Sequence, residues 1–196
     1  MYSALLNLQG KKVTVVGGGE VAFRKVCSFI EEGCKVYVLA PYLIEAFQTL
    51  QNKIHIENKV YEEGDGLGSF VMVAATDNAE VNRQIGEFCE RENILCNVVD
   101  NKALSTFIVP STLKRGDLTI SVSTGGASPF LAAKIRRELE KQYDEHYGEY
   151  IERLGRIRQY VLNTVPDELE KKRILKYLIT LNQEELEKYE KSYINR

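Results

Sequence analysis

The sequence is short of the residues that bind metals and of the long apolar segments that cross membranes. It has two histidines and four cysteines, with no CxxC pair, among 196 residues. This set does not predict a metal site, and buried thiols are favoured over disulfide bonds or a zinc centre. No apolar run approaches the roughly 20 residues that span a bilayer. The N-terminus lacks a signal-peptide pattern, so a cytoplasmic protein without membrane contact is expected.

The charges are nearly balanced. There are 26 basic and 28 acidic residues, which give a net charge of −2. This balance argues against a protein that binds nucleic acid through a general basic surface. The apolar fraction of 44% and the chain length allow one domain with its own core plus an appendage.

Residues 12–22 carry the most informative pattern. Residues 12–16 form a short β-branched run typical of a buried parallel strand, and the motif Gly17-x-Gly19-x-x-Ala22 follows directly. The first glycine permits a tight turn, and the second lets the backbone approach a pyrophosphate. Ala22 lets the next helix lie close to the strand. Because strand, turn and helix occur together, we interpret the motif as a dinucleotide site rather than only a tight turn.

The second expected strand, residues 35–39, is not followed by the acidic residue that holds the ribose in most NAD sites. It runs into Ala40, Pro41 and Tyr42, and no arginine follows that could bind the 2′-phosphate of NADP. The ribose must then be held by backbone, by Tyr42 or by another segment. NAD is the expected cofactor, with the preference over NADP left open.

Strand and helix patterns alternate over the first 100 residues, which predicts an α/β fold with a doubly wound parallel sheet of the Rossmann type. The expected strands are residues 12–16, 35–39, 54–60, 70–75 and 95–99. Helices are expected after the first strand and over residues 42–50 and 79–91. Ligands of such sheets bind at the carboxyl ends of the strands. Candidates at these ends are Thr76, Asp77, Asn97, Asp100 and Asn101.

The pattern changes in the second half of the chain. Two strands are expected at residues 106–109 and 118–123, with turn residues between them. Ser128 and Pro129 suit the cap and the first position of a following helix. From Tyr147 onward the sequence predicts helices alone. For this tail we expect a role in packing or dimerisation rather than in catalysis.

Asp100 directly follows the last expected strand of the sheet. A carboxylate at the edge of a nicotinamide site can act as a general base or orient a substrate nitrogen, especially where burial raises its pKa. A simple turn residue after a strand has the same pattern. Both interpretations stay open on the residues alone.

The loop of residues 123–129 places Ser123, Thr124 and Gly125 shortly before a helix. Glycine-rich backbone amides at a helix N-terminus can bind an anion, and the nearby Arg137 would strengthen such a site. A plain loop is equally consistent with the pattern.

Five short motifs occur in chain order over about residues 1–145. They are Val16-Gly17-Gly18-Gly19-x-Val21-Ala22-x-Arg24-Lys25, Ala75-Thr76-Asp77-x-x-x-x-Asn82, Asn97-Val98-Val99-Asp100, Phe107-Ile108-x-Pro110-x-x-x-x-Arg115-Gly116 and Ser123-Thr124-Gly125-Gly126-x-Ser128-Pro129. In this combination the chain resembles the bacterial precorrin-2 dehydrogenases, which also form the N-terminal half of fused siroheme synthases.

The resemblance implies a homodimeric enzyme that oxidises precorrin-2 to sirohydrochlorin with NAD⁺ in siroheme biosynthesis. It implies a Rossmann domain over residues 1–110, an α+β dimerisation region over 111–145 and a helical domain over 146–196. Asp100 matches the family residue tied to catalysis. The matches to dinucleotide contacts are Glu20, Val21, Pro41 and Tyr42, which join Gly17, Gly19 and Thr76 as the expected cofactor site. The expected substrate residues are Asn97, Ser123, Thr124, Gly125 and Arg137.

Two other functions stay open. Some relatives also insert ferrous iron into sirohydrochlorin, and the sequence does not exclude such a bifunctional enzyme. A non-catalytic NAD-sensing module would share the glycine motif, but it would not explain Asn97, Asp100 or the loop of residues 123–129. Dehydrogenation alone is favoured, while the role of the helical tail and the final tetrapyrrole product are left open.

Overall fold

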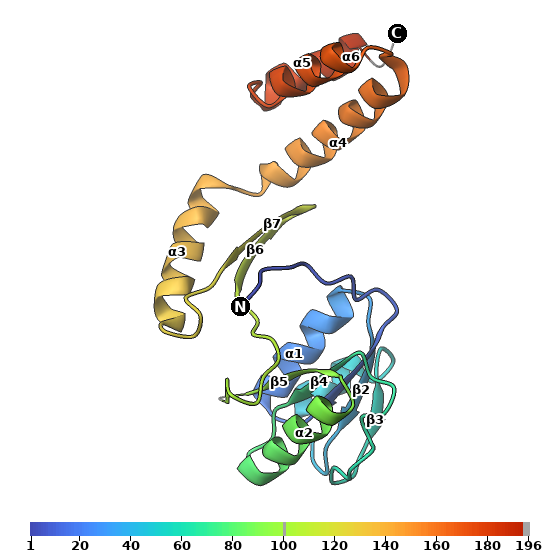
Figure 1. Ribbon diagram of the computed structural model, residues 1–196, viewed down its shortest axis with the longest axis vertical. Coiled ribbons are helices and arrows are strands. Elements are labelled where there is room, and N and C mark those ends of the chain that lie inside the picture. Colours follow the sequence, from blue (N-terminus) through green and yellow to red (C-terminus); the bar gives the residue numbers. More distant parts are fainter. Residues whose placement is uncertain (100, 194–196) are drawn as a thin grey trace. The chain divides into compact units, whose positions relative to one another are not determined.

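The computed structural model describes residues 1–99 and 101–193. The chain divides into two compact units, Met1–Val109 and Pro110–Arg196 (Figure 1). Buried apolar side chains form separate clusters in each unit, so each is described by itself.

The first unit is built on a five-stranded parallel sheet with the spatial order β3-β2-β1-β4-β5. The strands are β1 (Lys12–Val16), β2 (Lys35–Leu39), β3 (His55–Glu57), β4 (Val71–Ala74) and β5 (Leu95–Val98). The chain runs outward from β1 in one direction and then returns to its other side. This reversal is the hallmark of a doubly wound sheet, and it confirms the expected α/β fold class.

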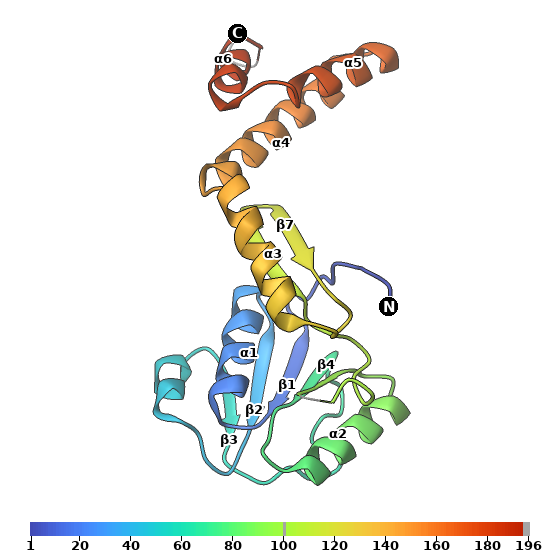
Figure 2. The ribbon, with the colours of Figure 1, turned by 90° about the vertical axis from the view of Figure 1, so that its left-hand side faces the viewer.

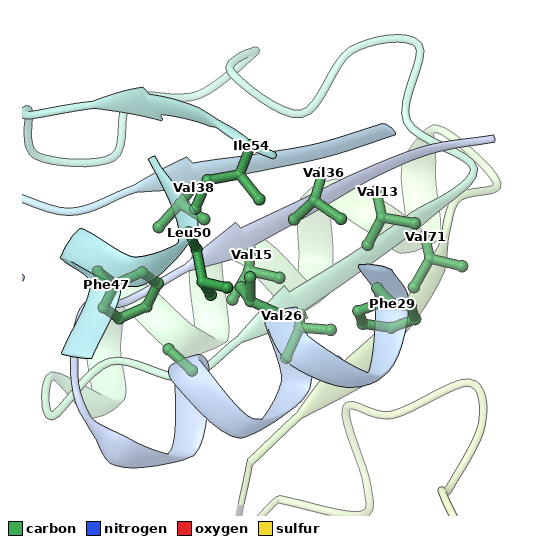
Figure 3. Close-up of a cluster of buried hydrophobic side chains, with 12 residues drawn as sticks. Val13, Val15, Val26, Phe29, Val36, Val38, Phe47, Leu50, Ile54 and Val71 are labelled. Carbon is green, nitrogen blue, oxygen red and sulfur yellow. The ribbon is translucent and has the colours of Figure 1, made fainter. Parts of the chain in front are cut away.

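Two helices cover opposite faces of this sheet (Figure 1). Alternate residues of a strand point to opposite faces, so β1 sends Val13 and Val15 towards α1 (Glu20–Glu31), which packs there with the 3₁₀ helix η1 (Glu45–Leu50) (Figure 3). Val16 instead joins the cluster under α2 (Ala79–Arg91). The central strands β1 and β4 are buried on both faces, which explains their nearly continuous apolar sequence.

Two segments beside the sheet differ from expectation. The helix expected over residues 42–50 begins only at Glu45, since the amide of Ile44 donates to the carbonyl of Gly18 at 2.9 Å. The strand expected over residues 54–60 is only His55–Glu57, because the amide of Lys59 donates back to the carbonyl of Glu57 at 3.0 Å and ends it.

The expected strand at residues 106–109 is wrong. The amides of Thr106 and Phe107 both donate to the carbonyl of Cys96, and the Thr106 hydroxyl accepts from the amide of Cys96 at 2.7 Å. The segment is thus held to β5 by this shared carbonyl and by side-chain hydrogen bonds instead of pairing along the strand. The strand forms later, as β6 (Ser111–Arg115).

The second unit begins with an antiparallel pair, β6 and β7 (Leu118–Val122), against which α3 (Pro129–Gln142) packs (Figure 2). As expected, Ser128 caps α3, and its side chain accepts from the amide of Leu131. Three helices follow, α4 (His146–Thr164), α5 (Glu168–Leu178) and α6 (Gln183–Tyr193). Within the described residues, no helix combines the length and apolar character that a membrane span requires.

Candidate active site

The turn between β1 and α1 admits no side chain at its first two glycines. Gly17 has a φ of +131°, and a Cβ there would lie 2.2 Å from the carbonyl oxygen of Ala75. A Cβ on Gly18 would lie 1.9 Å from the carbonyl oxygen of Tyr42. The turn therefore lies in close contact with the backbone segments that follow β4 and β2, and only glycine fits at these two positions.

Gly19 differs from its two neighbours because nothing lies within 4 Å of the position of its Cβ. It is the N-cap residue of α1, and no described side chain caps the helix. The first-turn amides of α1 can therefore bind an anion, which the helix dipole also favours. An open glycine beside an uncapped helix end fits a dinucleotide pyrophosphate.

Thr76, in the segment after β4, is fixed by the buried side chain of Asn82 in α2. The Asn82 Oδ1 accepts from the Thr76 amide at 3.2 Å and from its hydroxyl at 2.7 Å, while Asn82 Nδ2 donates to the Thr76 carbonyl at 3.0 Å. Asn78 caps the same helix by accepting from two of its first amides. The sequence motif contained Asn82, but only the structure shows that it positions Thr76.

These segments line an open cavity of about 730 Å³ within the first unit, a size typical of small-molecule sites. Its wall includes all seven residues expected at the cofactor, Gly17, Gly19, Glu20, Val21, Pro41, Tyr42 and Thr76. They come from the ends of three neighbouring strands, β1, β2 and β4. Ligands of open α/β sheets bind at this edge, so the residues present fit a dinucleotide.

A fourth segment of the wall, residues 59–61, was not anticipated from the sequence. Lys59 bonds to Asp65 through its Nζ and the Oδ1 at 2.8 Å, and this bond raises the pKa of Lys59. The buried Tyr61 hydroxyl has no hydrogen-bond partner among the described residues, and burial raises the pKa of Tyr61 to about 12. The sequence predicts one strand over residues 54–60, so it does not predict that residues 59–61 line the cavity. The strand ends at Glu57.

The end of β5 holds the other candidates of the first unit. Asn97 is half-buried, and its Nδ2 donates to the carbonyl of Phe107 at 3.3 Å, which fastens the segment leading out of the unit. Val99 contributes to the cavity wall. Asp100, the expected catalytic residue, lies outside the described residues.

The remaining candidates belong to the second unit, where the hydroxyls of the loop before α3 hold the loop itself. Ser123 Oγ accepts from the amide of Gly125 at 3.1 Å, and Thr124 Oγ1 accepts from the amide of Ser128 at 2.9 Å. Gly125 takes a positive φ of +63°, which favours glycine. Arg137 is exposed, and its Nε donates to a carbonyl of its own helix at 3.3 Å.

Potential metal ligands do not gather in the part of the chain that the structure describes. No group of three or more His, Cys, Asp or Glu side chains there could hold a metal ion. All four cysteines are free thiols, with Cys89 and Cys96 fully buried between α2 and the sheet.

Comparisons with known proteins agree with this architecture. The family model described as putative NAD(P)-binding matches residues 4–111, and the model described as sirohaem biosynthesis protein central matches residues 115–142. A precorrin-2 dehydrogenase of Priestia megaterium is 32% identical over 160 residues, which cover 81% of this chain and 79% of that protein. A siroheme synthase of Citrobacter koseri is 36% identical over 157 residues, but these cover only 34% of its length.

A solved structure named "SirC, precorrin-2 dehydrogenase" matches all of this chain with a TM-score of 0.84 and 28% identity. The chain spans about a third of the siroheme synthases that it matches, and most of the Priestia protein. The nucleotide-binding match identifies a nicotinamide dinucleotide as the class of cofactor. The resemblance seen in the sequence motifs is thereby confirmed, and the chain belongs to the family of precorrin-2 dehydrogenases and siroheme synthase N-terminal domains.

Proposed function

We propose that this chain oxidises precorrin-2 to sirohydrochlorin with NAD⁺ in tetrapyrrole biosynthesis. The observation that carries the proposal is the cavity at the carboxyl edge of the sheet, whose wall holds the glycine turn, the uncapped end of α1 and the fixed Thr76. This cavity occurs in a chain that aligns with 79% of a protein named precorrin-2 dehydrogenase.

The residues of the first unit would bind and orient the cofactor. Amides at the start of α1 bind the pyrophosphate, and the open position at Gly19 lets the phosphates approach the backbone. Asn82 holds Thr76 at the wall, so that this part of the site is formed before binding. When bound, the nicotinamide supplies the chemistry of hydride acceptance.

The oxidation removes a hydride and a proton from the macrocycle. Catalysis therefore requires a group that accepts the proton or orients the macrocycle for its loss. We assign this role to Asp100, which follows the wall residue Val99 in the sequence. Its carboxylate would accept the proton or hold the pyrrole nitrogens. Substitution to alanine is expected to abolish turnover while cofactor affinity is retained.

The substrate bears eight carboxylates, which require local hydrogen-bond donors and positive charge. We propose Asn97 together with Ser123, Thr124, Gly125 and Arg137 as its contacts. The hydroxyls of Ser123 and Thr124, which accept from amides of the loop, can still donate their own protons to carboxylates, and the exposed guanidinium of Arg137 can bind them as well.

Dehydrogenation alone, in the cytoplasm, is favoured over a combined dehydrogenase and iron chelatase. The sequence has only two histidines and no obvious cluster of metal ligands, which favours dehydrogenation alone. A homodimer is also part of the proposal. It is supported by Phe130 and Leu131 at the start of α3, whose side chains are 89% and 47% exposed and would be covered in an interface.

Anaerobic incubation of the protein with precorrin-2 and either NAD⁺ or NADP⁺ tests the proposal. We expect absorbance of reduced nicotinamide and of sirohydrochlorin to appear together, faster with NAD⁺. Dinucleotide binding without any oxidation of precorrin-2 would instead support the NAD-sensing alternative. In a separate arm, sirohydrochlorin and Fe²⁺ without dinucleotide should give no siroheme, and its formation would reveal the bifunctional enzyme.

A further inference from the structure

The cofactor-binding edge lacks an acidic residue after β2, but the neighbouring strand brings a lysine to the same wall. Leu39 of β2 is in register with Glu57 of β3, and the carbonyl of Glu57 accepts from the amides of Ala40 and Lys59 at 3.2 and 3.0 Å. Lys59 thus contributes to the cavity wall together with Pro41, in the region where an NAD site usually holds the adenosine ribose.

Two carboxylates hold the ammonium group of Lys59. Its Nζ lies 2.8 Å from Asp65 Oδ1 and 3.5 Å from Glu62 Oε2. Asp65 is itself fixed, because its Oδ2 accepts from the amide of Glu62 at 2.7 Å, and its side chain is only 16% exposed. Lys59, Glu62 and Asp65 together carry a charge of −1, so the lysine does not provide a free positive charge.

This arrangement distinguishes between a hydroxyl and a phosphate. An ammonium group has three donors, so a lysine bonded to Asp65 can still donate to a ribose oxygen. A phosphate monoester carries a charge of about −1.5 to −2 at neutral pH, and the two carboxylates oppose its approach. NADP sites usually meet this phosphate with an arginine that remains available to it.

We propose that Lys59, held by Asp65 and Glu62, determines cofactor specificity by donating to the ribose hydroxyls of NAD⁺ while the two carboxylates exclude the 2′-phosphate of NADP⁺. The inference rests on the proposed function, because it takes the cavity as the dinucleotide site. It also supplies the polar contact that the missing acid after β2 would have provided.

Calorimetric titration of the full chain with NAD⁺ and with NADP⁺ tests the proposal. Wild type is expected to bind NAD⁺ more tightly. Asp65→Asn releases the charge of Lys59, so NADP⁺ affinity should rise about tenfold while NAD⁺ affinity changes little. Lys59→Gln should weaken NAD⁺ binding, and adding it to Asp65→Asn should remove the gain for NADP⁺.

Glu63→Gln is the matched control. This carboxylate lies in the same loop but pairs with Arg91, so its loss should leave the ratio of the two affinities unchanged. Thermal unfolding of each variant checks the fold. Should Asp65→Asn fail to fold, Glu62→Gln leaves the bond between Lys59 and Asp65 intact and should shift the ratio in the same direction by a smaller factor.

The outcomes separate this inference from the proposed function. Binding of NAD⁺ by wild type with an unchanged affinity ratio in the folded Asp65 or Glu62 variant overturns the specificity role alone. A wild-type protein that binds neither dinucleotide contradicts the cofactor site itself, and with it both proposals.

Discussion

At the scale of single residues, three consecutive glycines meet three different requirements. Gly17 needs a positive φ and lies against the Ala75 carbonyl, Gly18 lies against the Tyr42 carbonyl, and Gly19 opens onto free space. The first two are therefore required by packing, while the third is suited to the approach of a ligand.

Alanine substitutions separate these roles. Gly18→Ala drives a methyl group into the Tyr42 carbonyl, so we expect the free energy of unfolding to fall by about 1–3 kcal/mol and NAD⁺ binding to be lost. Gly19→Ala places its methyl group in open space and should fold with a loss below about 1 kcal/mol. Denaturant unfolding and NAD⁺ titration measure both effects, and equal stability of the two variants would refute the assigned packing role.

Asn82 provides a second test among single residues. Asn82→Ala leaves the Thr76 amide and carbonyl without this partner, which should cost about 1–3 kcal/mol of unfolding free energy and raise the Kd for NAD⁺. Asn82→Asp keeps the acceptor but loses the donor to the carbonyl, so an intermediate Kd is expected. A wild-type Kd in the alanine variant would show that Thr76 needs no such support.

The sequence predicts the positions of those wall residues that depend on a local pattern. The spacing of the motif predicts the glycines at Gly17 and Gly19. The need for glycine at Gly18 arises from the backbone of Tyr42, which is distant in the sequence. Lys59 could not be anticipated either, because its place at the wall depends on where the chain turns after β3.

At the scale of elements, the sequence predicts the boundaries that a local pattern defines and misses those that depend on contacts with distant residues. The strands Lys12–Val16 and Lys35–Leu39 and the helix Ala79–Arg91 occur as expected, since apolar periodicity and capping residues define them locally. Residues 106–109 have the alternation of a strand, but the amides of Thr106 and Phe107 both donate to the single carbonyl of Cys96. Such a long-range bond leaves no trace in the local pattern.

The helices of the second unit are joined by a charge cluster that should make them sensitive to acid. Glu190 of α6 accepts from Arg153 at 2.5 Å and from Arg156 at 2.8 Å, both in α4. The hydrogen bond from Arg156, with the charges of both arginines, lowers the pKa of Glu190 below its usual 4.5. A lowered pKa means that the stabilisation is present above pH 4.5 and is lost as the pH falls through the folded-state value.

This acid sensitivity can be measured by hydrogen exchange of α4 and α6 from neutral pH to below pH 4.5. We expect their protection to fall as the pH drops below 4.5 in wild type, and Glu190→Gln to lose about 2 kcal/mol of protection at pH 7 and the acid sensitivity together. The variant Glu184→Gln, exposed on the same helix, serves as a control. Acid sensitivity that persists in the Glu190 variant would assign it to other carboxylates.

At the scale of the whole molecule, the cavity is formed entirely by residues of the first unit. NAD⁺ at a hundredfold excess over its Kd should therefore add about 2.7 kcal/mol to the stability of that unit. Hydrogen exchange of the full chain should show the largest gain around the glycine turn and Thr76. Protection confined to residues 110–193 would place the cofactor elsewhere.

The central claim is that the cavity at the glycine turn holds the cofactor for precorrin-2 oxidation. Its most direct test is anaerobic turnover of precorrin-2 with NAD⁺ by wild type and Gly19→Asp, which adds a carboxylate where the pyrophosphate should lie. We predict one NADH per sirohydrochlorin in wild type, and a folded variant whose Kd for NAD⁺ rises at least about tenfold with a matching loss of turnover at low NAD⁺. Equal NAD⁺ affinity and turnover in the two proteins would contradict the account.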